Sequence, residues 1–142
     1  MEIRPASVAD ATAIAPLLAE LGYPAELETV AARLGRITDG AGRAGVLLAE
    51  AGSAPAALIA YQLIEHLERP APTCRITALV TSAEHRRRGV AARLLAAVEE
   101  LARERGCDRL EVTTRPHRED ALGFYLDAGF AERPRRLVRS LT

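Results

Sequence analysis

The sequence contains no lysine and no tryptophan, and these two absences exclude several kinds of chemistry. All 19 basic residues are arginines. The chain therefore has neither the phosphate-binding lysine of a P-loop nor the amine that Schiff-base and pyridoxal phosphate enzymes require. Aromatic residues make up only 4% of the chain, which argues against the stacking platforms that bind single-stranded nucleic acid. The core must rest on aliphatic side chains packed in layers.

Cysteines and long apolar runs are also scarce. Cys74 and Cys107 lie far apart, with no CxxC pair and no histidine at ligand spacing, so we expect neither a metal site nor a disulfide framework. The longest apolar region, residues 46–64, is interrupted by a glutamate, a glycine and a proline, and no charged-then-apolar leader begins the chain. These features predict a soluble cytoplasmic protein without a membrane partner.

The chain has the length and apolar content of one domain, residues 1–142. It is 49% hydrophobic, which is enough to bury a single core. The formal net charge is zero, but the charge is unevenly distributed: residues 1–71 hold 5 arginines and 9 acids, whereas residues 72–142 hold 14 arginines and 10 acids. This asymmetry favours the second half as the place where an anion binds.

Hydrophobic spacing and turn residues predict an α/β domain with a mixed sheet. In the first half, the predicted elements are an edge strand at 1–6, a helix after Ser7 that ends before Gly22, a helix at 26–37, and strands at 44–50, 56–67 and 74–81. In the second half, they are a helix at 89–105, a strand at 109–114, a helix at 118–128 and a last strand near 135–141.

The stretch HRRRGVAARLL, residues 85–95, places three arginines before a glycine and an amphipathic segment. A strand that turns tightly into a helix directs the helix's first free N–H groups at whatever lies beyond the strand end, and phosphates bind at such ends. Gly89 lets an anion approach the main chain, and Arg86, Arg87 and Arg88 raise the local positive potential. The stretch therefore suits a pyrophosphate.

This stretch also has two other interpretations. Taken alone, the arginines are an ordinary solvated loop. The following helix, however, places Val90, Leu94, Val98 and Leu101 on one face, which indicates that it packs on a sheet and that its N-terminus is fixed. A nucleic-acid recognition helix is disfavoured because the arginines precede the helix and the whole chain is neutral. We therefore expect no nucleic-acid partner.

Two segments together carry a family resemblance. The basic turn fits the pattern [QR]-x-x-G-x-[GA] at Arg86, Gly89 and Ala91, and ALGFYLDAGF fits A-x-x-F-Y-x-x-x-G-F at residues 121–130. With this order of elements, the chain resembles the GNAT superfamily of acetyl-coenzyme A-dependent N-acetyltransferases, most closely over residues 74–130. The resemblance implies a mostly antiparallel sheet of six to seven strands with about four helices, in the order β-α-α-β-β-β-α-β-α-β.

The resemblance also implies a cofactor, a substrate class and a set of binding residues. The cofactor is acetyl-coenzyme A, and the acceptor is a small-molecule amine. Backbone amides of residues 86–91, including Val90, would hold the pyrophosphate. Main-chain groups around Leu79 and Val80, where the fourth strand splays from the fifth, would face the pantetheine, with His117 and Arg118 near its reactive end. A homodimer through the C-terminal strand is plausible by the same analogy.

Tyr125 is the candidate acid for the departing thiol. A phenol has a pKa of about 10 and a thiol about 8.5, so a positioned phenol can donate to the leaving sulfur. Alternatively, Tyr125 is a core residue, because Leu122, Tyr125 and Leu126 share a helical face.

The general base is not evident from the sequence. In similar acetyltransferases a glutamate stands early in the fourth strand, where this chain has Arg75 and Ala78 instead. Glu65, His66, Glu68 and His117 are substitutes, although surface roles suit them better. Arg75 would suit an acidic group on the acceptor. The alternative to an enzyme is a GNAT-like protein that binds acyl-coenzyme A but lacks the base.

Overall fold

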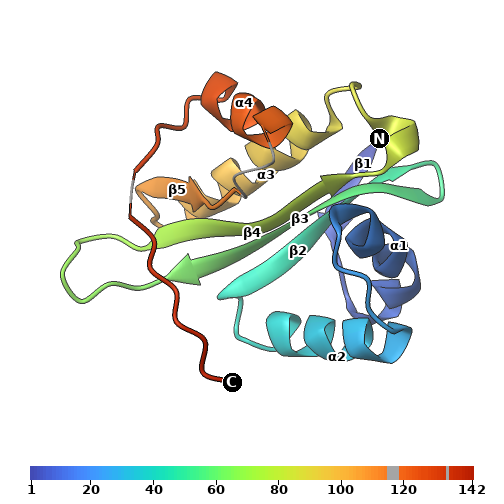
Figure 1. Ribbon diagram of the computed structural model, residues 1–142, viewed down its shortest axis with the longest axis horizontal. Coiled ribbons are helices and arrows are strands. Elements are labelled where there is room, and N and C mark those ends of the chain that lie inside the picture. The colour runs from blue at the N-terminus through green and yellow to red at the C-terminus, as the bar shows by residue number, and fades with distance from the viewer. Residues whose placement is uncertain (115–118, 134) are drawn as a thin grey trace.

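A mixed sheet runs through the middle of the molecule, and helices cover both of its faces (Figure 1). The computed structural model describes residues 1–114, 119–133 and 135–142. Within these ranges the sheet has five strands in chain order, β1 Glu2–Pro5, β2 Ala44–Ala51, β3 Ala54–Ile64, β4 Thr73–Thr81 and β5 Arg109–Val112. The first four strands pair antiparallel, and β5 pairs parallel to β4.

Two helices lie on each face of the sheet (Figure 1). Helices α1 Ala11–Leu21 and α2 Leu27–Thr38 pack on one face, after the 3-10 turn Val8–Asp10. Helix α3 Val90–Glu104 packs on the other face, which α4 Glu119–Asp127 also covers. The crossover from β4 through α3 to β5 is what makes the last pair of strands parallel.

The alternation of side chains along the strands divides the interior into two cores. Leu47, Ala49, Ile59 and neighbouring residues pack with α3, whereas Leu48 and Leu58, one position away, pack with α1 and α2. Because both faces of the central strands are covered, β2 and β3 are apolar without interruption over most of their lengths.

The predicted α/β class and the predicted order of helices are confirmed, but the predicted number of strands is wrong. Residues 135–142 form no strand and are exposed to solvent, so the described sheet has five strands and not six to seven. The segment leaves α4 without joining the sheet (Figure 1). Its alternation would place Leu137, Arg139 and Leu141 on one face, and an unpaired guanidinium is costly to bury. The homodimer expected through this strand stays a prediction.

Candidate active site

The site lies where β4 and β5 separate. Their parallel pairing runs from Thr73 opposite Arg109 to Ile76 opposite Val112. Beyond that point β4 continues to Thr81, still paired with β3 but no longer with β5. Leu79 and Val80, the two residues expected beside the pantetheine, lie in this part of β4; Leu79 lines the pocket described below, whereas Val80 is buried in the core beneath α1 and α2.

A β-bulge marks the point of separation. Ala60 on β3 is opposite Ala78, whereas the next residue, Tyr61, is opposite Ile76, so Thr77 has no partner on β3. The extra residue reverses the alternation of β4: Ile76 belongs to the α3 core, but Val80 belongs to the α1–α2 core. Bulges of this kind redirect side chains and free backbone groups beside active sites.

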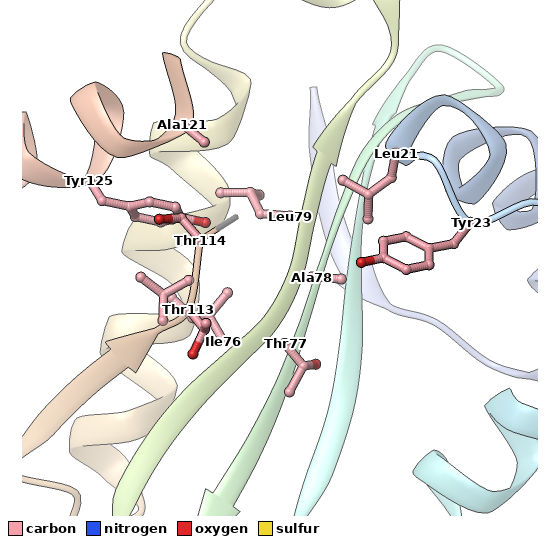
Figure 2. A pocket seen from close by; sticks show the side chains of 11 residues that line it. Leu21, Tyr23, Ile76, Thr77, Ala78, Leu79, Thr113, Thr114, Ala121 and Tyr125 are labelled. Atoms are coloured by element: carbon pink, nitrogen blue, oxygen red, sulfur yellow. The ribbon is translucent and has the colours of Figure 1, made fainter. Parts of the chain in front are cut away.

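A pocket of about 110 Å³ opens between the separated strands. Figure 2 shows Tyr125 and Ala121 of α4 on one side of β4, and Leu21 and Tyr23 on the other. The strands contribute the rest of its lining, namely Ile76, Thr77, Ala78, Leu79, Val112, Thr113 and Thr114. Among the described residues the lining has hydroxyl groups but no carboxylate, guanidinium or imidazole, so its wall is uncharged at neutral pH.

Tyr125 reaches this pocket from α4 and is held by aromatic contacts. Its side chain is buried, and the rings of Phe124 and Phe130 contact it edge-on, each with centroids 5.3 Å away. Burial raises the pKa of Tyr125 to about 12, because the phenolate would lose its hydration. The phenol is therefore protonated at neutral pH, and it can donate a hydrogen bond into the pocket.

The turn before α3 has the backbone geometry of an anion site. Gly89 is the N-cap of α3 at φ 76°, and it has no side chain with which to cap the helix. A Cβ added there would meet no protein atom within 4 Å, so the main chain is open to solvent. Arg87 also has a positive φ of 63°, which is uncommon for a residue with a side chain and is found at ligand sites. Free helix N–H groups at this turn could hold a diphosphate.

The arginine side chains around this turn are exposed, whereas the helix below it is anchored. Arg86 donates from Nε to the carbonyl oxygen of Thr81 at 3.3 Å, while Arg87 and Arg88 are exposed. Val90 is buried in the α3 core, and Ala91 is half-buried. Thus three exposed arginines directly precede an N-terminus whose position is fixed by packing.

The other described residues predicted to take part in the site do not line the pocket. His117 and Arg118 lie outside the described residues. Glu65 and Glu68 are exposed, and His66 Nε2 lies 2.8 Å from the hydroxyl of Thr73 at the start of β4. None of these three lines the pocket. Arg75, which stands where a glutamate was expected, pairs with Glu111 on β5.

Three features of the site were missed from the sequence. Tyr23 follows α1 in a segment without a motif, and it lines the pocket opposite Tyr125. The bulge at Thr77 depends on how β4 pairs with β3. Glu111 stands in the predicted strand 109–114, and only the β4–β5 register places it beside Arg75. The sequence offers one signal, which concerns Glu111: it is a charged residue directly before Val112, and Val112 lines the pocket.

The comparisons with known proteins agree with this geometry. The profile of the acetyltransferase (GNAT) family matches residues 13–130. The chain belongs to the GNAT acetyltransferase family. No curated protein matches the sequence. Among the described residues, no helix is both long and apolar enough to cross a membrane.

Solved structures show the same fold at low sequence identity. A transcriptional regulator from Bacillus halodurans is 22% identical with a TM-score of 0.87, and the match covers 99% of each chain. An aminoglycoside 6'-N-acetyltransferase from Acinetobacter haemolyticus is 20% identical with a TM-score of 0.85, covering 100% of this chain and 99% of that one. A second aminoglycoside N-acetyltransferase, in complex with coenzyme A, is 19% identical with a TM-score of 0.86, covering 98% and 93%.

Proposed function

We propose that the chain, acting as a single domain, transfers the acetyl group of acetyl-coenzyme A to a primary amine of a small molecule. The observation that carries this proposal is the separation of β4 from β5, because the pocket that contains Tyr125 opens there and β4 continues from it towards the turn that precedes α3. Family membership supports acetyl transfer, and a solved structure of the same fold holds coenzyme A. The amine attacks the thioester directly while both substrates are bound.

The cofactor would bind mainly through the backbone of this chain. The free N–H groups of residues 86–91 would hold the diphosphate, assisted by the guanidinium groups of the turn. The unpaired edge of β4 near Leu79 and Val80 would offer main-chain groups to the pantetheine. When bound, the cofactor supplies an activated acetyl group as a thioester. The small pocket would keep that thioester in an environment without charged side chains.

Tyr125 would stabilise the departing sulfur as a hydrogen-bond donor. Because its pKa is raised to about 12, complete proton transfer to a thiolate of pKa about 8.5 is unfavourable. A hydrogen bond that strengthens as negative charge develops on sulfur has no such penalty. We therefore assign Tyr125 to stabilisation of the leaving group.

The test is a two-part measurement on the purified full chain. Calorimetry should detect binding of coenzyme A and acetyl-coenzyme A, and a thiol-release assay should detect turnover with at least one member of a panel of primary amines. Binding without turnover would favour the second candidate, an acyl-coenzyme A-binding protein. The absence of a carboxylate from the described pocket lining favours that candidate. Absence of binding would contradict both.

A further inference from the structure

An ion pair stands at the rim of the pocket and is not used by the mechanism described so far. Arg75 on β4 and Glu111 on β5 are opposite each other in the parallel register. Arg75 donates from Nε to a carboxylate oxygen of Glu111 at 2.5 Å. Two residues after each of them comes a threonine that lines the pocket, Thr77 and Thr113 respectively. The pair therefore lies next to the pocket along these two strands.

The pair faces the side of the sheet opposite α3 and α4. Cys74 and Ile76 belong to the α3 core, and Leu110 and Val112 pack against it, so Arg75 and Glu111 point to the other face. Tyr23 lines the pocket from that same side (Figure 2). The side chains of Arg75 and Glu111 are 47% and 35% exposed, which leaves the pair accessible to a small molecule.

Further charged side chains lie near this pair. Two residues before Glu111 on β5, Arg109 donates from Nε to the hydroxyl of Thr73 at 3.3 Å, and no ion pair with an acid is found for Arg109 among the described residues. Arg69 pairs with Asp108. Burial, and after it the charges of Asp108 and Glu65, raise the pKa of Cys107, so Glu65 also belongs to this neighbourhood. The guanidinium of Arg109 can attract an anion without the loss of an ion pair.

We propose that the acceptor is an amine that also carries an anionic group, and that the Arg75–Glu111 pair recognises both groups. The inference rests on the proposed acetyl transfer. The anionic group binds the guanidinium of Arg75, and Glu111 then faces the ammonium group at the pocket rim. Because Arg75 and Glu111 contact each other, an anion and an amine that bind to both must lie close together, as in a molecule where two or three carbon atoms separate them.

The arrangement also supplies the missing proton acceptor. The ammonium group gives one proton to Glu111, directly or through one water, and Glu111 releases it to solvent. The nitrogen then forms the new C–N bond as the C–S bond of the thioester breaks. The second nitrogen proton leaves with the thiol, so the products are an amide, a free thiol and one released proton.

The experiment compares β-alanine with β-alaninamide as acceptors at equal concentrations of free amine. We expect wild type to favour β-alanine at least about tenfold in kcat/KM, since a charge-assisted contact in a partly exposed site is worth about that factor. Arg75→Gln should remove the preference, mainly through KM for β-alanine. Glu111→Gln should lower kcat for both amines about tenfold or more. Equal use of the two amines by wild type would overturn the proposal.

Two controls separate this proposal from the acetyl transfer on which it rests. Arg103→Gln removes an exposed arginine paired with Glu99 on α3, away from the pocket, and should keep the preference intact. Calorimetric titration of β-alanine into protein saturated with coenzyme A should show binding that Arg75→Gln and Arg75→Met both weaken. Turnover of amines without a preference for the anion refutes the acceptor assignment alone. Loss of coenzyme A binding in wild type refutes the proposed function itself.

Discussion

The proposed cofactor side and the proposed acceptor side of the site are built by different means. On the proposed cofactor side, the geometry of the turn at Gly89 follows from a strand, a glycine and a helix that are consecutive in the chain, and the turn would act through main-chain N–H groups. On the proposed acceptor side, Tyr23, Arg75 and Glu111 come from separate elements and would act through side chains. In this proposal, binding a common carrier depends on the local backbone, whereas choosing an acceptor depends on residues that are distant in the chain.

Tyr125→Phe should have the largest effect of the single changes, because it removes the one donor proposed for the leaving sulfur. We expect kcat to fall by about 100-fold or more, the usual range for such a group. Coenzyme A affinity should stay unchanged, since the Phe ring keeps the contacts with Phe124 and Phe130. Steady-state kinetics and calorimetry on the same preparation measure both quantities.

The raised pKa of Tyr125 adds a condition to this prediction. Because the group titrates near 12, the wild-type rate should show no loss from Tyr125 ionisation between pH 7 and pH 10. A Tyr125→Phe variant with an unchanged kcat would return Tyr125 to a packing role.

Gly89→Ala tests the backbone character of the cofactor side. Alanine at φ 76° is strained by about 1–2 kcal/mol, and the added methyl group occupies the approach to the turn. We expect coenzyme A affinity to fall about 10- to 100-fold in calorimetry, as when one or two hydrogen bonds to a charged group are lost.

The matched control for Gly89→Ala is Gly106→Ala. Gly106 ends α3 at φ 80°, and a Cβ there also meets nothing within 4 Å. Both variants should therefore lose similar stability, while only Gly89→Ala loses cofactor affinity. Equal affinity losses would mean that α3 transmits strain along its length and that the turn is no specific site.

The same contrast explains what could be predicted from the sequence. The turn at 86–89, helix α3 and Tyr125 were identified because each signal lies within a few consecutive residues. Thr77 could not be recognised as a bulge, because the extra residue exists only relative to Tyr61 and Ala60 on β3. The prediction of a last strand was wrong for a related reason. Residues 135–141 have the local alternation of a strand, but they do not pair with the sheet, and pairing cannot be predicted from the local pattern.

The pairing of Arg75 with Glu111 shows the same limit. Each residue stands in a predicted strand, and Arg75 occupies the position where similar acetyltransferases have a glutamate. Their contact follows from the parallel register, which is set by the crossover through α3. The role of Arg75 on β4 can therefore be interpreted only together with Glu111, which lies 36 positions later in the chain.

Gly45→Ala should reduce stability without changing the binding properties of the folded protein. Gly45 on β2 is opposite Tyr61 on β3, and a Cβ there would lie 2.6 Å from the Tyr61 hydroxyl. The buried Tyr61 ring has to move, and we expect a loss of about 1–3 kcal/mol in the free energy of unfolding. In Gly35→Ala the new Cβ meets only a Val8 methyl group at 3.7 Å, so denaturant unfolding should show no loss.

Asp10→Asn should have the smallest effect, and it tests whether the α1–α2 layer depends on charge. Arg4 donates to both Asp10 oxygens, at 2.7 and 3.0 Å, and its Nε donates to Glu50 at 2.8 Å. The hydrogen bonds from Arg4 lower the pKa of Asp10 to about 2 from 3.8. A depressed carboxyl pKa stabilises the folded state above about pH 4, and this contribution disappears as the pH falls towards 2.

At neutral pH we expect Asp10→Asn to lose about 1 kcal/mol, a value reduced because Arg4 is about one-third exposed. The difference in unfolding free energy between wild type and variant should shrink between pH 4 and pH 2, as urea denaturation at each pH would measure. A difference that stays constant down to pH 2 would mean that Asp10 acts through hydrogen bonds that survive protonation. In that case the ion pair between Arg4 and Asp10 would contribute to the α1–α2 layer as a set of hydrogen bonds and not through its charges.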